Sequence, residues 1–445
     1  MTATPLDGPA ASAPPARLRT LHVVVLVVCT LVAFLDGFDV QMISFLAPAI
    51  AREWQAPKEV FGLIFSSGIA GMLVGMVGQG PFSDRFGRKP MVLFCVATFG
   101  LCTLACAFAQ SPAQLIVVRF LGGLGMGAVM PNVIVLVAEI APPQLRSRMV
   151  VLLGAGVPVG GLSAGALSAW LLPLVGWREI FIAGGVAPLL LTPVLALWMP
   201  ESPMFRLERA RRRSGDRRLA DERRVQALVQ RGWVAPEPAA ATGTTTPGVK
   251  ALFDGASRRN TLLIWLIFAA NMMLFYSVLS WMPLILTSTG TPEGLAALSG
   301  AMLNLGAVAG SLPLAWAADR FGVKRVIPLA FVAGGVLFCA TGALLGVSYP
   351  ALLMLCTVLG AISGGGQLLL NAVVSGLYPT AVRATGFGFA GMAGRAGAIA
   401  GPLACGAMLA LGVSEAGLLA LLAAPALVAA LAATRLRTAG SAQSA

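Results

Sequence analysis

Charged side chains inside apolar runs of this sequence are the first candidates for chemistry. Two of them, Asp36 and Asp39, are three positions apart, so on a helix they point to nearly the same side. Two carboxylates this close resist simultaneous ionisation, so one of them can hold a proton near neutral pH. Because a charge at membrane depth is costly unless it is paired or hydrated, we expect this pair to bind and release protons. The alternative is a pair that only anchors helix packing.

Two arginines, Arg119 and Arg395, stand in similar apolar surroundings. With a rise of about 1.5 Å per residue, Arg119 and Asp36 reach nearly the same depth, which predicts that Arg119 contacts Asp36 or Asp39. That contact would be either a switch for proton loading or a fixed structural ion pair. Arg395 lies close to mid-membrane, and its planar guanidinium suits a carboxylate ligand. The alternative for Arg395 is packing against backbone carbonyls.

The composition indicates that these charges lie in a membrane protein and not in a water-soluble one. Of the 445 residues, 57% are hydrophobic and only 11% are charged, and the mean hydropathy is +0.85. Soluble domains are about 25% charged, so a soluble enzyme with this composition could not cover its surface with polar groups. The chain has one histidine, His22, and its seven cysteines lie in apolar runs without CxxC spacing. We therefore expect no enzyme, no metal site and no cofactor.

Apolar runs long enough to cross a membrane, about 20 residues each, dominate the chain. They predict an all-α membrane protein with twelve spans, at 20–48, 58–81, 90–109, 113–140, 147–172, 178–199, 259–288, 294–318, 324–346, 349–374, 382–410 and 413–434. The expected organisation is two six-helix bundles with a polar linker and two tails, at 1–19, 20–199, 200–258, 259–434 and 435–445.

The excess of basic residues lies mainly in the loops on one side of the predicted spans. With both termini cytoplasmic, 26 of the 31 Lys and Arg residues fall on the cytoplasmic side and three fall outside. This is the distribution of a membrane protein, so the net charge of +13 needs no nucleic acid partner. Residues 206–224 hold nine arginines. A solvated loop explains them best, and contact with anionic lipid head groups is the alternative.

A short motif occurs once in each half. Asp84-Arg85-Phe86-Gly87 follows the second span, and Asp319-Arg320-Phe321-Gly322 follows the eighth. Two repeated bundles with a site at their interface are typical of alternating-access transporters. The segment Gly80-x3-Asp84-Arg85-x-Gly87-Arg88-Lys89 resembles the cytoplasmic loop signature of the major facilitator superfamily. Arg119-x3-Gly123-x-Gly125-x-Gly127 resembles its fourth-helix motif, and Pro200-Glu201-Ser202-Pro203 resembles its segment after the sixth span.

A narrower resemblance is to the aromatic acid/proton symporters. The segments that carry it are Asp36-Gly37-Phe38-Asp39, Met130-Pro131-Asn132, and Tyr378-Pro379-Thr380-x2-Arg383-Ala384-Thr385-Gly386 leading to Gly394-Arg395-x-Gly397. The resemblance implies import of benzoate-, hydroxybenzoate- or phenylpropanoate-like anions across a bacterial inner membrane, with protons as the coupling ion. The short outer loops favour a monomer. A carrier of another organic acid, a drug or metabolite efflux antiporter and a non-transporting receptor are the alternatives.

For such a substrate, Arg395 is expected to hold the carboxylate. The expected walls and polar contacts around the ring are Phe38, Asn132, Asn271, Tyr276, Trp281, Asn304, Gln367 and Asn371. Glu139 is about 30 Å from Arg119 along one helix, so we expect it to meet Arg88 or Arg146 instead. Together the charges at the cytoplasmic end are expected to form a gate, and they are Asp84, Arg85, Arg88, Glu139, Arg146, Asp319, Arg320 and Arg383.

Overall fold

The computed structural model describes residues 18–211, 216–230, 252–253, 257–378 and 380–436. This part of the chain is helical and contains no strand. The N-terminal half holds α1 (Thr20–Trp54), α2 (Glu59–Gly78), α3 (Gly80–Phe86), α4 (Arg88–Cys106), α5 (Pro112–Ile140), α6 (Arg146–Val175) and α7 (Trp177–Trp198). The C-terminal half holds α10 (Ser257–Ser288), α11 (Glu293–Phe321), α12 (Val323–Ala343), α13 (Tyr349–Gly360), the π-helical turn η2 (Ala361–Gly365), α14 (Gly366–Leu377), α15 (Thr380–Ala410), α16 (Glu415–Leu421) and α17 (Ala423–Thr434).

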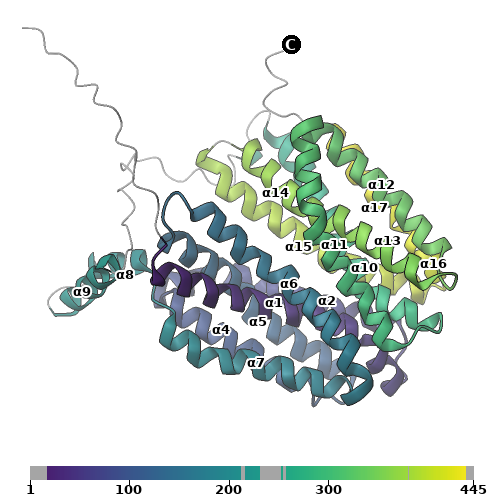
Figure 1. Cartoon of the computed structure of the whole chain (residues 1–445), viewed down its shortest axis with the longest axis horizontal. Helices are drawn as coiled ribbons and strands as arrows, with labels where there is room; N and C mark the ends of the chain where they lie inside the picture. The colour runs from purple at the N-terminus through teal and green to yellow at the C-terminus, as the bar shows by residue number, and fades with distance from the viewer. Residues whose placement is uncertain (1–17, 212–215, 231–251, 254–256, 379, 437–445) are drawn as a thin grey trace, which may run out of the picture.

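The helices form two side-by-side bundles, purple to blue and green to yellow in Figure 1. Eleven helices of the described part are long and apolar enough to cross a membrane. The tenth is α13, η2 and α14 in one line, and the last is α16 with α17. The remaining predicted span, the eleventh at 382–410, corresponds to α15, which is rich in glycine and carries Arg383 and Arg395. The expected twelve-helix fold is therefore confirmed.

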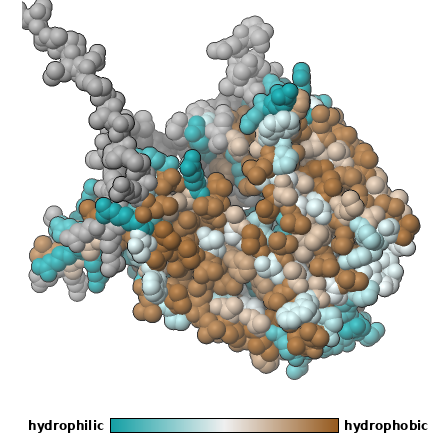
Figure 2. Space-filling model, viewed as in Figure 1, coloured by the Kyte–Doolittle hydropathy of each residue, from teal (hydrophilic) through white to brown (hydrophobic). Residues whose placement is uncertain are grey.

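The outer surface of both bundles is apolar. Figure 2 shows hydrophobic side chains along the middle of the helices and hydrophilic ones at their ends. Large apolar side chains such as Leu197, Leu312 and Trp170 are 81%, 79% and 67% exposed. A water-soluble protein rarely exposes so extensive an apolar surface. An apolar surface of this extent is suited to contact with lipid.

The two ends of the helices make two different faces of the molecule. Because the spans alternate in direction, α1 begins and α17 ends on the same face, here called the terminal face. Two further helices follow α7 at this face, α8 (Pro203–Arg211) and α9 (Asp216–Gln230). Val225 and Leu228 of α9 pack against Leu21 and Leu207. Part of the linker predicted at 200–258 is thus a helical pair attached to the first bundle, and its residues 212–215, 231–251 and 254–256 lie outside the described ones.

The bundles contact one another mainly near the opposite face. There the Ser66 hydroxyl of α2 donates to the Ile399 carbonyl of α15 at 2.8 Å. Two ion pairs join the bundles at the same end, Arg52 with Glu293 at 2.9 Å and Lys58 with Glu415 at 2.5 Å.

Toward the terminal face the bundles part. A cavity of about 530 Å³ separates Val151 of α6 from α11, α12 and α14. None of the ion pairs in the described part of the chain links the two bundles on this side. The structure is therefore closed at the opposite face and open toward the terminal face.

Candidate functional site

A central cavity of about 320 Å³ lies between the bundles and receives residues from α1, α2, α5, α6, α10, α14 and α15. Most of its wall is apolar, with Ile69, Met72, Phe268 and Met272 among the lining residues. Its polar side chains are Asp36, Gln41, Tyr276, Gln367 and Arg395. An apolar cavity with a few placed polar groups is the usual form of a site for a small organic ligand.

Close packing of α1 on α6 brings Asp36 to this cavity. Gly37 lies so close to α6 that a Cβ atom there would stand 2.0 Å from the Val157 carbonyl oxygen. On the other side of the contact, a Cβ atom at Gly160 would stand 2.0 Å from the Phe34 carbonyl oxygen. Small residues at such crossings let helix backbones approach in membranes. Both Asp36 and Gly37 then line the cavity.

The predicted contact of Arg119 with an α1 aspartate is present, and the partner is Asp39. Arg119 Nη1 lies 3.2 Å from Asp39 Oδ2 and donates to the Asp39 carbonyl at 3.2 Å. The Thr103 hydroxyl of α4 donates to Asp39 Oδ1. Asp39 and Arg119 are 4% and 6% exposed, and neither lines the cavity. The two charges therefore neutralise one another within the first bundle, while Arg119 Nε is buried without a hydrogen-bond partner among the described residues.

Asp36 is in a different situation. It is 4% exposed and lines the cavity, and its Oδ1 has no hydrogen-bond partner among the described residues. Arg395 of the other bundle is close enough for the two charges to interact, although they form no direct ion pair in the described part of the chain. Arg395 makes no hydrogen bond or ion pair with any described residue. The site thus holds one carboxylate and one guanidinium that are both open to a ligand.

Three of the residues expected to bind substrate line the cavity, namely Arg395, Tyr276 and Gln367. Three others lie directly behind them or beside the wall. Asn271 Nδ2 donates to Gln367 Oε1 at 2.9 Å, and Gln367 Nε2 donates to Asn371 Oδ1 at 3.1 Å. Asn304 Nδ2 donates to Gln41 Oε1 at 2.6 Å. These asparagines hold the two glutamines that face the cavity.

The remaining three expected substrate residues lie elsewhere, so their placement at the cavity was wrong. Asn132 lies on α5 between Met130 and Ile134, which line the cavity, but its side chain faces another side of the helix, where it donates to the Ser83 hydroxyl at 3.0 Å. Trp281 donates to the Pro402 carbonyl at 3.2 Å and packs against Phe65, which seals the contact between the bundles. Phe38 points to the other side of α1, into an apolar crevice that α6 and α7 complete.

Of the expected gate charges, two form an ion pair. Arg88, one of the two partners expected for Glu139, has its Nη2 3.4 Å from Glu139 Oε1. The Ser202 hydroxyl also donates to Glu139. The guanidiniums of Arg85 and Arg320 lie over aromatic rings of their own helices, and Arg383 Nε donates to the Tyr378 carbonyl at 3.4 Å. Asp84, Arg146 and Asp319 are exposed at the terminal face.

Three residues that position the site were not among the sequence candidates. Glu201 accepts from the backbone N–H groups of Arg88 and Lys89 at 2.9 and 3.1 Å, so it caps the start of α4. A carboxylate at a helix start is stabilising because the free N–H groups and the helix dipole both favour it. Thr103 and Gln41 are uncharged and stand among apolar residues. Glu201 had a signal as part of the Pro200-Glu201-Ser202-Pro203 motif, and Gln41 had one as a polar residue on the same span as Asp36.

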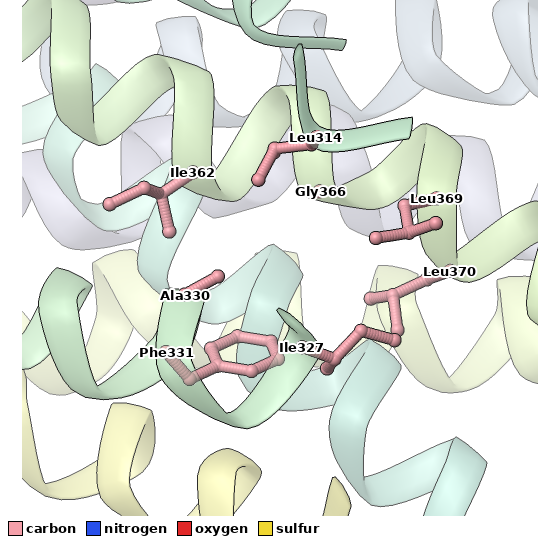
Figure 3. A pocket seen from close by; sticks show the side chains of 8 residues that line it. All are labelled: Leu314, Ile327, Ala330, Phe331, Ile362, Gly366, Leu369 and Leu370. Atoms are coloured by element: carbon pink, nitrogen blue, oxygen red, sulfur yellow. The ribbon is translucent and has the colours of Figure 1, made fainter. Parts of the chain in front are cut away.

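A second pocket, inside the C-terminal bundle, is unsuited to a charged ligand. Figure 3 shows that its eight lining residues, which come from α11, α12, η2 and α14, are all apolar. Its volume of about 10 Å³ is near that of a single water-sized probe. The central cavity is therefore the candidate site.

Comparisons with known proteins agree with this geometry. The profile of the Major Facilitator Superfamily matches residues 29–307 and 264–444. The chain is 36% identical over 410 residues to a gallate transporter of Pseudomonas putida, covering 92% of this chain and 90% of the relative. It is 35% identical over 389 residues to a 4-hydroxybenzoate transporter of the same species, covering 87% and 86%.

Solved structures show the same fold at lower sequence identity. A D-xylose-proton symporter gives a TM-score of 0.71 at 17% identity, covering 94% of this chain and all of the other. A bacterial homologue of the lysosomal transporter Spinster, inward-facing and unoccupied, gives 0.70 at 17% identity, covering 94% and 95%. The chain belongs to the major facilitator superfamily and, within it, to the aromatic acid/proton symporter family.

Proposed function

We propose that this protein imports an aromatic carboxylate together with protons by alternating access. The observation that carries the proposal is the pair of open charges in the central cavity, Arg395 from one bundle and Asp36 from the other. The guanidinium suits the carboxylate of the substrate. The apolar wall around it, which includes Phe268 and Met272, suits an aromatic ring.

The two open charges also explain how substrate and proton would bind together. In the empty cavity the Asp36 carboxylate is balanced by the nearby Arg395. A substrate anion that takes Arg395 deprives Asp36 of that balance, so Asp36 then gains by binding a proton. The loaded cavity carries no more net charge than the empty one, which lets the bundles close around it. Arg119 and Asp39 satisfy one another and are assigned a supporting role.

The terminal face is the cytoplasmic one in this proposal. By the order of the spans in the sequence, nearly all loop Lys and Arg residues belong to this side, and such residues accumulate on the cytoplasmic side of membranes. The protein would then be a monomer in the bacterial inner membrane with both termini inside, and the structure would be its inward-facing state. No cofactor is needed, since the proton gradient supplies the energy. The exposed Arg211, Arg223 and Arg224 of the α8–α9 pair would meet anionic lipid head groups.

The proposal is tested by uptake into proteoliposomes. Labelled benzoate, 4-hydroxybenzoate and 3-phenylpropanoate are offered with and without an inward proton gradient. We expect at least one acid to accumulate, and the accumulation to collapse when a protonophore is added. Uptake driven by an outward proton gradient would instead indicate an efflux antiporter. Absence of any uptake by folded protein contradicts the proposal.

The role of Arg395 is tested by Arg395→Gln with Arg395→Lys beside it. Removing the charge is expected to raise the KM at least tenfold, because a charge-assisted hydrogen bond contributes about 1.5–3 kcal/mol. Lysine keeps the charge but not the planar fork, so we expect an intermediate KM. Equal uptake by all three proteins would show that Arg395 does not hold the carboxylate.

A further inference from the structure

Gln41 stands at the closed end of the central cavity. It follows Asp36 by five residues on α1, so it lies about 7 Å nearer the opposite face. The cavity opens the other way, toward Met130 and Ile134 in the terminal half of α5. Gln41 lines the cavity and is only 4% exposed. A ligand that enters from the terminal face therefore meets this amide last.

The side chain of Gln41 is held in place by the other bundle. Its Oε1 accepts from Asn304 Nδ2 at 2.6 Å, and the same Asn304 amide donates to the Gly300 carbonyl at 3.0 Å. Gln41 also lies against α6, since a Cβ atom at Gly161 would stand 2.2 Å from Gln41 Nε2. With both ends of the amide constrained, its orientation in the cavity is fixed before a ligand arrives.

Hydrogen-bonding capacity is left over at this end of the cavity. Gln41 Nε2 donates to none of the residues that the structure describes. Asn304 is 1% exposed, and its Oδ1 is buried without a donor in the same part of the chain. Asn304 is not among the residues that line the cavity, so the Gln41 N–H group is the one that a ligand can reach. A hydroxyl group, whose oxygen accepts a hydrogen bond, is a simple partner for this donor.

An aromatic acid bound at Arg395 can place a hydroxyl there. The carboxylate would lie at the level of Asp36 and Arg395, and the ring would extend along the apolar wall toward the closed end. A substituent on the far side of the ring then reaches Gln41. Unsubstituted benzoate offers only a C–H group at that point, so the Gln41 N–H would stay unpaired once the cavity closes.

We propose that Gln41, positioned by Asn304, recognises a ring hydroxyl, so that the substrates are hydroxylated aromatic acids rather than unsubstituted ones. This inference rests on the proposed function, which concerns the carboxylate and the proton only. A site that hydrogen-bonds a substrate hydroxyl discriminates against analogues that lack it. An unpaired buried donor corresponds to roughly a tenfold to hundredfold loss of affinity.

The test compares 4-hydroxybenzoate with benzoate, as labelled substrates and as competitors of each other, in proteoliposomes under one inward proton gradient. The wild-type protein is expected to show a KM for 4-hydroxybenzoate at least tenfold below that for benzoate. In Gln41→Leu the two KM values are expected to agree within about threefold, because only the hydroxylated acid loses a contact. Benzoate uptake by this variant reports that it is folded.

The matched control is Gln367→Leu, which removes the other cavity glutamine at the open end. It is expected to keep the preference for 4-hydroxybenzoate. Wild-type protein without a preference, or an unchanged preference in Gln41→Leu, overturns the inference while leaving aromatic acid transport intact. If Gln41→Leu fails to fold, the preference of the wild-type protein, measured by competition between the two acids, tests the inference instead. Uptake of neither acid would contradict the proposed function itself.

Discussion

Asp36 and Asp39 are both aspartates of α1, and their different surroundings give them different roles. Asp39 is bonded to Arg119 and Thr103, whereas Asp36 lines the cavity with an oxygen that no described residue bonds. A carrier for protons must be able to change its charge at moderate cost. In the proposed cycle Asp36 would do so because the nearby opposite charge of Arg395 would be taken by the substrate.

Replacing Asp36 by Asn is expected to uncouple transport from protons. The variant should exchange labelled for unlabelled substrate across the membrane, because binding and reorientation need only Arg395 and the apolar wall. It should fail to accumulate substrate when a proton gradient is applied. Both assays use the same proteoliposomes. Gradient-driven accumulation at the wild-type level in Asp36→Asn would refute the role given to this residue.

Replacing Asp39 by Asn is expected to act on stability instead. It leaves the buried Arg119 without its counter-charge, and breaking one side of a buried ion pair costs about 3–5 kcal/mol. The thermal unfolding temperature in detergent should fall clearly below that of Asp36→Asn. The double variant Asp39→Asn with Arg119→Gln should recover part of this loss. A variant Asp39→Asn as stable as the wild type would contradict the supporting role.

At the scale of the helices, the contact of α1 with α6 sets where Asp36 and Gln41 point. Gly37 and Gly160 allow the two backbones to touch, and Gly161 makes room for the Gln41 amide. The site therefore depends on residues that carry no chemistry. Larger side chains at these glycines would separate the helices and turn the polar groups away from the cavity.

The substitution Gly37→Ala tests this packing. Its Cβ atom would stand 2.0 Å from the Val157 carbonyl oxygen, so α1 must move. We expect a loss of about 1–3 kcal/mol of stability, the usual cost of overpacking, and a raised KM. Gly154→Ala in α6 is the matched control, since nothing lies within 4 Å of a Cβ atom there. Equal unfolding temperatures of the two variants would contradict the close contact.

At the scale of the whole molecule, the two ion pairs between the bundles mark the closed side. Position 58 and position 293 are equivalent in the internal repeat, since Asp84 and Asp319 are separated by the same interval. Their residues, Lys58 and Glu293, have opposite charges, and each pairs with the other bundle. These pairs exist only while the opposite face is closed, so they stabilise the state that is open toward the terminal face relative to a state that is open toward the opposite face.

Breaking both pairs is expected to shift the balance between the two states. The double variant Arg52→Glu with Lys58→Glu should open the opposite face. The shift should be about twofold to thirtyfold, because two exposed ion pairs contribute about 0.2–1 kcal/mol each. The readout is the reaction of Ser66→Cys with a membrane-impermeant maleimide added from outside.

Restoring opposite charges with Glu293→Arg and Glu415→Arg should return this reactivity toward that of Ser66→Cys alone. The same maleimide applied to protein without Ser66→Cys measures the background from the native cysteines. Reactivity that does not depend on any of these charges would mean that apolar contacts alone keep the opposite face closed.

The sequence by itself determined the fold and the general kind of site. Runs of apolar residues must become helices in lipid, because lipid satisfies no backbone hydrogen bond. The repeated Asp-Arg-Phe-Gly motif indicated two bundles. Charges buried in such runs are too costly to be accidental, so Asp36, Arg119 and Arg395 could be selected without a structure. Spacing along one helix also excluded Arg119 as the partner of Glu139 and left Arg88 or Arg146, of which the structure shows Arg88.

Only the tertiary structure decided which side chains share the cavity. Asp36 and Asp39 are less than one helical turn apart on α1. Only the packing of α1 on α4, α5 and α6 leaves the Asp36 carboxylate open to the cavity and pairs the Asp39 carboxylate with Arg119. The same packing turns Phe38 away and closes the bundle contact over Trp281. Gln41 gains its place from Asn304, which is 263 residues away in the chain. Contacts between distant helices depend on how their surfaces fit, and no local pattern encodes that fit.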